Sequence, residues 1–591
     1  MRIPQFKQRL LSYLNGLETS YQRQLAHTCD VHYNDTVLLQ LCFDGHIPMI
    51  SWCFNHGFDV NQCRNNEMTP LHVAVSKCST KIVRMLLDIR ADYNKCESGG
   101  WSPVMRACFE GHTEIVRILL DVGANYNKCE NDGWSPLMFA CTNGHTEIVS
   151  MLLDIGADYD KCANDGWSPV MLACSKGHIE IVRMLLDIGE DYNKCGYDGW
   201  SPVICACSEG HTKILRMLLD IGADYNKCKH DGWSPLMFAC SEGHKEIVRM
   251  LLDIGAYFNK CENDGWSPVM LACSEGHTEF VMMLLDIGAD YDKCNNEGWS
   301  PVMRACRKKH KEIVDMLLDI GADYGKCENN GWSPVMFACS NGHTEILRML
   351  LDIGSDYNKC KHDGWSPVIL ACSEGHTKIV RMLLDIGADY NKSENDGWSS
   401  VMFACSEGHT EIVRMLLDIG ADFNKCENDG WSPVMCACRK EHTEIVRMLL
   451  DKGADYDICE NDGWSPVVCA CIQGHTEIVR MLLDIGADYA KCKNDGWSPL
   501  MCACSEGHTE IVRMLLDIEA DYNICEINGL SPLIIACRYG FTEIVRMLLC
   551  IGVDYNKCDI YGRSSVIIAF ERCHSDIVSA INEHSMNQTG S

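Results

Sequence analysis

The chain repeats one pattern of apolar and polar residues every 33 positions. In residues 131–149, NDGWSPLMFACTNGHTEIV, a short apolar segment lies between Ser135–Pro136 and Gly144. Serine is a favourable helix N-cap, proline fits the first helical position, and glycine readily adopts the left-handed conformation that ends a helix. We therefore expect one short helix at this place in each repeat.

A second, more strongly apolar segment follows in each repeat. In residues 395–427, charged residues at i, i+3 and i+7 define one polar face, and apolar residues fill the other positions, which predicts a helix buried on most sides. The charged residues are Glu411, Arg414 and Asp418, and the apolar residues are Ile412, Val413, Met415, Leu416 and Leu417. We expect Gly420 to end this helix, and a residue equivalent to Thr146 to cap its start, with Glu147 at the positive end of the dipole. The Asn, Asp and Gly residues of ADFNKCENDG then predict a tight hairpin loop.

A unit of this size cannot bury its own apolar faces, so the repeats are expected to stack on one another. Seventeen units begin at residue 32 and at every 33rd residue through 560. We expect an N-terminal helical cap over residues 1–31, a divergent first repeat over 32–64 and fifteen repeats over 65–559. A degenerate capping repeat over 560–583 and a disordered tail over 584–591 complete the prediction.

The repeat resembles a known family. TPLH at 69–72, the phrases GHTEIV and LLDIGADYN and the 33-residue period closely resemble ankyrin repeats. The resemblance implies an all-α ankyrin-repeat solenoid, elongated and curved, with a helix–turn–helix and a β-hairpin loop in each repeat. In the family, a His and a neighbouring Thr, here His72 and Thr69, hydrogen-bond to tie repeats together. Most units of this chain carry Met at the His position, so we expect packing to supply more of that connection.

Composition narrows the classes of partner. The net charge is −30, which repels phosphate backbones and anionic membranes, so we expect no nucleic-acid binding. No stretch approaches the roughly 20 apolar residues of a membrane span, and residues 1–20 lack the apolar core of a signal peptide. These features predict a monomeric cytoplasmic protein, with access to the nucleus and without direct membrane insertion.

Thirty of the 39 cysteines occupy two repeated positions, one in the hairpin, such as Cys129, and one in the first helix, such as Cys141. Equivalent residues of stacked helices lie about 8–10 Å apart, whereas a disulfide needs Cα atoms within about 7 Å, which excludes a ladder of bridges between repeats. A buried thiol behaves as a small hydrophobe, and so many free thiols imply a reducing compartment.

The recurring pair of Cys141 and His145 is a candidate for metal binding or nucleophilic catalysis. Zinc takes four ligands and each repeat offers two, while a catalytic pair needs a third, orienting group that no repeat supplies. In the family the equivalent histidine is a structural residue of the turn between the helices. We therefore predict no catalytic residue, no metal, no cofactor and no enzymatic activity.

All but Trp52 of the 14 tryptophans occupy one position, directly after the hairpin Gly. The resemblance places this position on the concave side, among the positions that partners contact, together with Asn131, Asp132, Thr142 and Asn143. Two interpretations stay open: the rings pack flat on the next unit, which we favour, or they contact a partner. The residues are Trp101, Trp134, Trp167, Trp200, Trp233, Trp266, Trp299, Trp332, Trp365, Trp398, Trp431, Trp464 and Trp497.

Binding specificity should lie where the units differ. The sharpest difference is a basic island in an acidic array, formed by Arg304, Arg307, Lys308, Lys309 and Lys311, and a weaker one contains Arg439 and Lys440. Both lose the turn glycine, to Lys309 and Glu441, which should strain a left-handed position. The island is either a site for an acidic partner or a solvated charge run that balances acidic neighbours.

The resemblance also implies a modification. Hairpin asparagines of ankyrin repeats are substrates of an asparaginyl hydroxylase when a Leu lies eight residues earlier. Asn94, Asn127 and Asn193 match this spacing and are the candidate hydroxylation sites.

These features together predict a non-enzymatic intracellular scaffold that binds partner proteins in the concave groove of an ankyrin solenoid. Basic or mixed partners are favoured over acidic ones by the net charge. Two alternatives are a substrate-recognition adaptor of a ubiquitin ligase and a mechanical linker between membrane and cytoskeleton.

Overall fold

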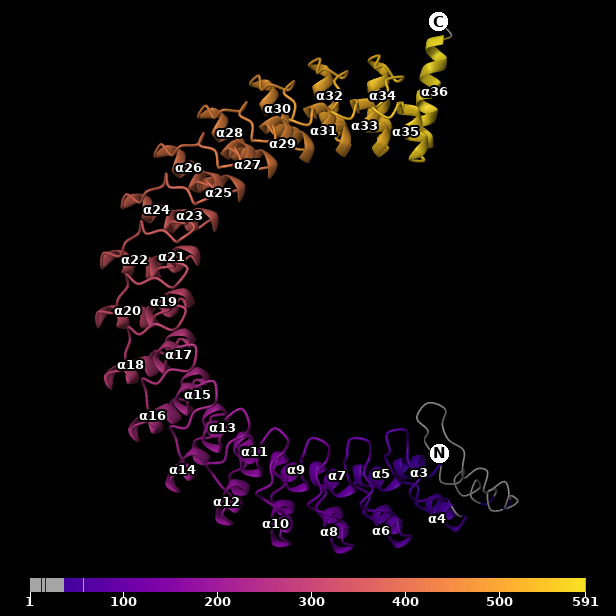
Figure 1. Ribbon diagram of the computed structural model, residues 1–591, viewed down its shortest axis with the longest axis vertical. Coiled ribbons are helices and arrows are strands. Elements are labelled where there is room, and N and C mark those ends of the chain that lie inside the picture. The colour runs from indigo at the N-terminus through magenta and orange to yellow at the C-terminus, as the bar shows by residue number, and fades with distance from the viewer. Residues whose placement is uncertain (1–11, 13–15, 17–36, 57, 590–591) are drawn as a thin grey trace. The chain divides into compact units, whose positions relative to one another are not determined.

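The computed structural model describes residues 12, 16, 37–56 and 58–589. Apart from residues 12 and 16, the predicted N-terminal cap over residues 1–31 lies outside the described residues. The chain divides into two compact units, Met1–Asn296 and Glu297–Ser591. Within each unit, helices alternate with loops in pairs, so that the first helices form one layer and the second helices another (Figure 1).

Seventeen helix pairs make up the described part of the chain, as the 33-residue period predicts. The helices of the first unit are α3 (Val37–Asp44), α4 (Ile47–Asn55), α5 (Pro70–Ser76), α6 (Thr80–Asp88), α7 (Pro103–Glu110), α8 (Thr113–Asp121), α9 (Pro136–Asn143), α10 (Thr146–Asp154), α11 (Pro169–Lys176), α12 (Ile179–Asp187), α13 (Pro202–Ser208), α14 (Thr212–Asp220), α15 (Pro235–Glu242), α16 (Lys245–Asp253), α17 (Pro268–Glu275) and α18 (Thr278–Asp286).

The helices of the second unit follow the same alternation of shorter first and longer second helices. They are α19 (Pro301–Lys308), α20 (Lys311–Asp319), α21 (Pro334–Ser340), α22 (Thr344–Asp352), α23 (Pro367–Ser373), α24 (Thr377–Asp385), α25 (Ser400–Ser406), α26 (Thr410–Asp418), α27 (Pro433–Arg439), α28 (Thr443–Asp451), α29 (Pro466–Gln473), α30 (Thr476–Asp484), α31 (Pro499–Glu506), α32 (Thr509–Asp517), α33 (Pro532–Tyr539), α34 (Thr542–Cys550), α35 (Ser565–Glu571) and α36 (Ser575–Thr589).

The predicted boundaries of the first helix are confirmed. In α9, Ser135 is the N-cap and its hydroxyl accepts a hydrogen bond from the Met138 N–H at 3.2 Å. Pro136 is the first helical residue, and Gly144 ends the helix in the left-handed region with φ 76°. The serine satisfies one of the free N–H groups at the helix start, which fixes where each first helix begins.

The predicted cap of the second helix is wrong. Thr146 is the first residue of α10, and the N-cap is His145, whose side chain makes no capping bond. The imidazole instead reaches the preceding repeat, where its Nε2 lies 3.1 Å from the Phe109 main-chain oxygen. Glu147 lies in the first turn as expected, where its charge is favourable to the helix dipole.

Apolar packing between repeats holds the stack together. In α26 the side chains of Ile412, Val413, Leu416 and Leu417 are buried as predicted, whereas Met415 is only half-buried. First helices of adjacent repeats pack against each other more extensively than second helices do. The core of each unit is therefore continuous along the layer of first helices.

Each loop is a tight turn with little strand character. The Glu130 N–H donates to the Trp134 main-chain oxygen at 3.1 Å, and Gly133 adopts φ 86°. A Cβ at Gly133 would meet the main-chain nitrogen of Asn164 in the next loop at 2.8 Å, so neighbouring loops lie in close contact there. Within the described ranges the expected β-hairpins are reduced to two isolated bridges, Ser393–Ser399 and Cys558–Ser564.

The C-terminal end differs from the prediction of a disordered tail over residues 584–591. Helix α36 continues to Thr589, because no Gly or Pro interrupts it before Gly590. The Tyr555 hydroxyl lies 3.2 Å from the Ser585 hydroxyl, which joins this extension to the loop between α34 and α35. None of the helices in the described part has the length and apolar content that a membrane crossing requires.

Candidate partner-binding surface

One side of each repeat carries the loop tip, the recurring tryptophan and the exposed part of the first helix, and we call it the tryptophan face. The repeated tryptophans are half-buried, except for Trp299, which is only 8% exposed. No ring is fully exposed among them, so the tryptophans are part of the packing between repeats and present only part of their surface to solvent. Contact between these rings and a partner stays a prediction.

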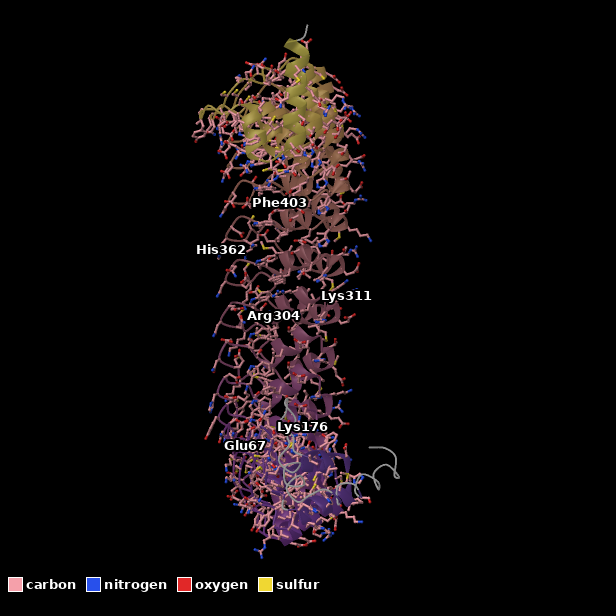
Figure 2. All side chains as sticks on the ribbon, turned by 90° about the vertical axis from the view of Figure 1, so that its right-hand side faces the viewer. Glu67, Lys176, Arg304, Lys311, His362 and Phe403 are labelled. Atoms are coloured by element: carbon pink, nitrogen blue, oxygen red, sulfur yellow. The ribbon has the colours of Figure 1, made fainter. Side chains whose placement is uncertain are left out.

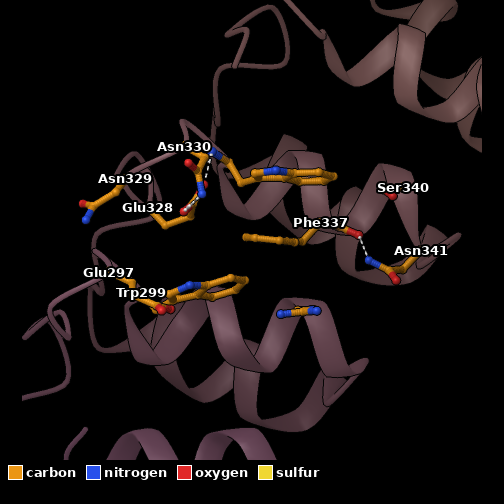
Figure 3. Close-up of a pocket in the computed structure, with 10 residues that line it drawn as sticks. Glu297, Trp299, Glu328, Asn329, Asn330, Phe337, Ser340 and Asn341 are labelled. Atoms are coloured by element: carbon orange, nitrogen blue, oxygen red, sulfur yellow. Dashed lines mark hydrogen bonds between the residues drawn. The ribbon is translucent and has the colours of Figure 1, made fainter. Parts of the chain in front are cut away.

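The first helix supplies a residue that lies between successive tryptophans, which we call the intercalating position. The Phe139 ring lies 4.3 Å from the Trp101 ring centroid and 5.3 Å from that of Trp134. Phe337 is stacked in the same way, 4.7 Å from Trp299 and 5.0 Å from Trp332 (Figure 3). The sequence analysis missed this position, although its variability at a fixed place in the first helix was a visible signal. Its occupants in the tryptophan repeats are Arg106, Phe139, Leu172, Cys205, Phe238, Leu271, Arg304, Phe337, Leu370, Phe403, Cys436, Cys469 and Cys502.

At two of the four positions where the intercalating residue is cysteine, successive tryptophans contact each other. The ring centroids of Trp167 and Trp200 lie 5.9 Å apart in the repeat of Cys205, and those of Trp431 and Trp464 lie 6.4 Å apart in the repeat of Cys469. Burial raises the pKa of the Cys205 thiol, so this cysteine acts as a small apolar residue.

Lysines of three loops lie over the tryptophan of the preceding repeat. Lys361 Nζ lies 4.8 Å from the Trp332 ring centroid and 3.0 Å from an Asp363 carboxylate oxygen. Lys229 and Lys493 make the equivalent contacts, with Trp200 and Trp464 as the rings. The face of a repeated tryptophan therefore accepts a cation in several places.

The loop tips predicted to contact partners are partly used by the scaffold. The Asn131 side-chain N–H₂ donates to the Ser98 main-chain oxygen at 3.3 Å, and the Asp132 N–H donates to the Glu130 carboxylate at 2.9 Å. Thr142 and Asn143 donate to main-chain oxygens of their own helix, both at 2.9 Å. The Asp132 carboxylate itself is exposed, as the hypothesis of a partner contact requires.

The basic island is divided between two faces. The Arg304 guanidinium lies 3.9 Å from the Trp299 ring centroid, and Arg307 lies 5.2 Å from it. Burial, with a further contribution from Arg307, lowers the pKa of Arg304 to about 10. Lys311 belongs to α20, where its Nζ lies 3.8 Å from a Glu345 carboxylate oxygen. Figure 2 shows Lys311 near one edge of the ribbon, with Arg304 nearer the middle.

The left-handed positions of the two basic segments are confirmed. Lys309 has φ 67° and Glu441 has φ 63°, where the other tryptophan repeats carry glycine. Lys308 precedes the first of these residues at the end of α19, and its side chain is exposed.

A pocket of about 610 Å³ opens on the tryptophan face within the second unit (Figure 3). Trp299, Phe337 and Trp332 line its apolar side, and Arg307 lines the side nearest the end of the first helix. Its remaining lining residues are polar: Glu297, Glu328, Asn329, Asn330, Ser340 and Asn341. A second pocket of about 220 Å³ is lined by Trp398, Ser406, Glu427, Asp429, Trp431, Cys436, Arg439 and Lys440.

The recurring Cys and His have structural environments. Cys141 is completely buried, and its pKa lies well above the ordinary value because burial penalises the thiolate. His145 contacts the Phe109 main-chain oxygen, and eleven further histidines at this position make the equivalent contact. His72 links repeats as the resemblance implied. Its Nδ1 lies 2.8 Å from the Thr69 hydroxyl, and its Nε2 lies 3.0 Å from the Trp101 main-chain oxygen of the next repeat.

The three candidate hydroxylation sites link neighbouring loops. The side-chain oxygens of Asn94, Asn127 and Asn193 each accept a main-chain N–H of the next repeat, at 2.8, 2.9 and 2.9 Å. All three side chains are half-buried. Their hydroxylation stays a prediction. In the part of the chain that the structure describes, no group of three or more His, Cys, Asp or Glu residues is placed to hold a metal ion.

Comparison with known proteins identifies the repeat. No curated protein matches the sequence. A family model described as ankyrin repeats (3 copies) matches overlapping segments that together span most of the chain. The segments are residues 10–96, 89–163, 155–229, 193–260, 254–327, 320–394, 390–459, 452–525 and 518–589. Together with the paired helices and tight loops described above, these matches show that the chain belongs to the ankyrin-repeat family.

Proposed function

We propose that this protein is a non-enzymatic scaffold that binds partner proteins along the tryptophan face. Membership of the ankyrin-repeat family indicates a protein-interaction function. The observation that supports this face is the pocket between Trp299 and Trp332, because it opens at the repeat that carries the basic island. Near-identical repeats present near-identical surfaces, so discrimination between partners requires such a difference.

The chemistry of this pocket suits protein recognition. Aromatic side chains and arginine are enriched among the residues that dominate binding energy, especially where polar groups surround them. Trp332 and Phe337 provide apolar surface here, and Arg307 and Asn341 provide polar groups at its border.

The face formed by the second helices, which we call the second-helix face, is less suited to binding because several of its arginines are already paired with glutamates. Arginines of the second helices pair with glutamates of the next repeat, as in Arg381–Glu411 at 3.4 Å and Arg447–Glu477 at 3.1 Å. A partner would have to break these contacts before it could form its own.

Charge favours basic or mixed partners along most of the tryptophan face. Asp396, Asp429 and Asp462 occupy the tips of three successive loops, and each is exposed. Because salt screens charges beyond about 8 Å at physiological ionic strength, these carboxylates act mainly on groups that dock beside them.

A substitution that fills the pocket between Trp299 and Trp332 tests the proposal. Ser340→Phe places an aromatic ring at a position where another repeat already carries Phe109, whose ring packs 5.4 Å from Trp101. Asp352→Phe, at the exposed end of α22 in the same repeat, is the control for an added aromatic residue.

Proteins captured by each full-length variant from cells that express the chain would be quantified by mass spectrometry. We expect Ser340→Phe to lose partners that wild type and Asp352→Phe retain. If Ser340→Phe keeps every partner while Asp352→Phe loses them, the binding face is the second-helix face and the proposal is wrong.

A further inference from the structure

We propose that Trp299–Arg307 and Trp431–Arg439 form two matched sites that bind acidic side chains of one extended partner segment. We call them the arginine stations. This inference rests on the proposed function, since it names the partner chemistry that part of the tryptophan face recognises. Both stations lie in the second unit and occupy the same position of the repeat, four repeats apart.

The two stations share one arginine-to-ring distance, although Arg304 also lies over Trp299 at the first station. The guanidinium carbon lies 5.2 Å from the ring centroid in both Arg307–Trp299 and Arg439–Trp431. Each arginine lies at the end of its first helix, in α19 and α27. At this distance a ring attracts the guanidinium as a cation, and its N–H donors can still bind a carboxylate.

Among the residues that the structure describes, neither arginine has an acidic partner. No ion pair within the described ranges involves Arg307 or Arg439, whereas Arg106 at the intercalating position is paired with Glu97. The exposed loop carboxylates of Asp396, Asp429 and Asp462 would bind basic groups of a partner, whereas the N–H donors of these two arginines would bind acidic groups. An acidic side chain supplies the planar, bidentate acceptor that an unpaired guanidinium fits.

Each station borders one of the two pockets described above on the tryptophan face. Arg307 lines the pocket of about 610 Å³, which lies toward the next repeat, and Arg439, with Lys440, lines the pocket of about 220 Å³, which lies toward the preceding repeat. Each pocket has two acidic lining residues, Glu297 and Glu328 in the first and Glu427 and Asp429 in the second. Glu328 accepts the Trp332 N–H at 3.0 Å, and Glu427 accepts the Trp431 N–H at 2.9 Å, so these two carboxylates are held against their own loops.

A second feature is shared by the stations and absent from the other tryptophan repeats. After the first helix, Lys309 and Glu441 occupy left-handed positions, with φ 67° and 63°, where glycine stands in the other repeats that carry the tryptophan. A non-glycine residue in this region costs on the order of 1 kcal/mol in general and occurs more often at functional sites. The same two repeats thus combine the unpaired arginine, the pocket and the strained turn.

The spacing defines the length of the partner segment. Helices of adjacent repeats pack about 8–10 Å apart, so four repeats separate the stations by roughly 32–40 Å. An extended chain advances about 3.3 Å per residue, so roughly ten to twelve residues connect two acidic groups that bind simultaneously. Simultaneous binding strengthens association because the second contact is intramolecular.

A synthetic peptide tests this inference on the full-length protein. The probe carries an Asp-Glu pair at each end of a spacer of about ten Gly and Ser residues, with a fluorescein label, and binding is measured by anisotropy. We expect Arg307→Glu and Arg439→Glu each to weaken binding at least about tenfold, since each removes one of two linked contacts. The neutral variants Arg307→Gln and Arg439→Gln should weaken binding in the same direction, and thermal unfolding confirms that every variant is folded.

The chain offers a matched control. Arg538 stands at the same repeat position in α33, where Leu530 replaces the tryptophan, so Arg538→Glu changes the net charge equally without affecting a station. We expect less than about a twofold change for this variant, and a peptide with a single Asp-Glu pair should bind at least about tenfold more weakly than the full probe.

Three results would overturn the inference: wild-type binding by both station variants, an equal loss in Arg538→Glu, or equally tight binding of a single-stranded oligonucleotide of the same charge. The last result would show a general response to polyanions. Failure of the proposed function is distinguishable, because Ser340→Phe tests the tryptophan face through captured partners and leaves both arginines in place.

Discussion

The His145 imidazole binds the main-chain oxygen of Phe109, a residue of the preceding repeat, at a distance of 3.1 Å. A histidine between two helices of one repeat thereby satisfies a free carbonyl at the end of the previous first helix. Repetition of this contact along the chain makes the turn histidine a connection between repeats, rather than a ligand or a base.

We expect His145→Ala to destabilise the repeats on either side of it by about 1–2 kcal/mol, because a carbonyl loses its partner. Hydrogen exchange should report faster exchange in α9 and α10. His230→Ala is the control, since His230 lies at an exposed loop tip. Equal effects of the two substitutions would contradict the structural role of the turn histidine.

A buried carboxyl group makes one repeat sensitive to pH. Glu190 is 2% exposed at a position where Ala157 and Ala223 stand in neighbouring repeats, and burial raises its pKa from 4.5 to about 8. Hydrogen bonds from the Val170 N–H and Ser168 oppose this rise, as does the charge of Lys194.

Because the folded state holds the proton more tightly than the unfolded state, stability decreases as pH rises from about 4.5 to about 8 and is constant above that range. We expect Glu190→Ala to remove this slope and to stabilise the repeat at pH 9 by an amount on the order of a few kcal/mol. Hydrogen exchange in α11 and α12 between pH 5 and 9 measures this pH dependence of stability. An unchanged slope in the variant would contradict its assignment to Glu190.

The intercalating position controls the tryptophan stack. Phe337→Ala should destabilise the second unit by about 3–4 kcal/mol, since it leaves a cavity between Trp299 and Trp332. Phe337→Leu should cost less, because Leu370 occupies the same position in the next repeat. Denaturant unfolding and iodide quenching of tryptophan fluorescence measure the two effects, and equal losses in both variants would contradict the packing model.

Glycine at the strained turns should be stabilising. We expect Lys309→Gly and Glu441→Gly each to raise stability by about 0.5–1 kcal/mol, because glycine adopts positive φ without a steric penalty. The reverse change, Gly342→Lys, should be destabilising, since a Cβ there would lie 2.8 Å from the His376 ring. Thermal unfolding midpoints rank the stabilities of these variants and wild type. A loss of stability in Lys309→Gly would contradict the conclusion that this turn is strained.

Much of the fold follows from single-repeat patterns. The cap at Ser135 and the left-handed Gly144 depend on the local chain alone, and the burial of Cys141 follows from its place on an apolar helix face. The cap at Thr146 was predicted wrongly because the preceding histidine takes the cap position in order to reach another repeat. The helix propensities of neighbouring residues cannot predict this contact, because it joins His145 to a different repeat.

The candidate site was less predictable than the fold. The tryptophans and the basic residues stand out in the sequence, but Phe337 does not, because its role depends on how one helix is rotated relative to two neighbouring loops. Arg307 in α19 lies on the tryptophan face and Lys311 in α20 on the second-helix face, although only three residues lie between them in the chain. Such relationships between repeats cannot be read from one repeat.

The contacts that join repeats have a consequence for how the array changes in length. Most repeats between Trp134 and Trp497 carry both halves of a contact between repeats, the histidine that binds the preceding repeat and the carbonyl that accepts from the next histidine. A whole repeat of this kind can therefore be inserted or removed with these contacts re-formed. An extra copy between Phe337 and Cys436 would leave both arginine stations intact and increase their separation from four repeats to five. Array length would then act as a ruler that selects the length of the segment bound across it.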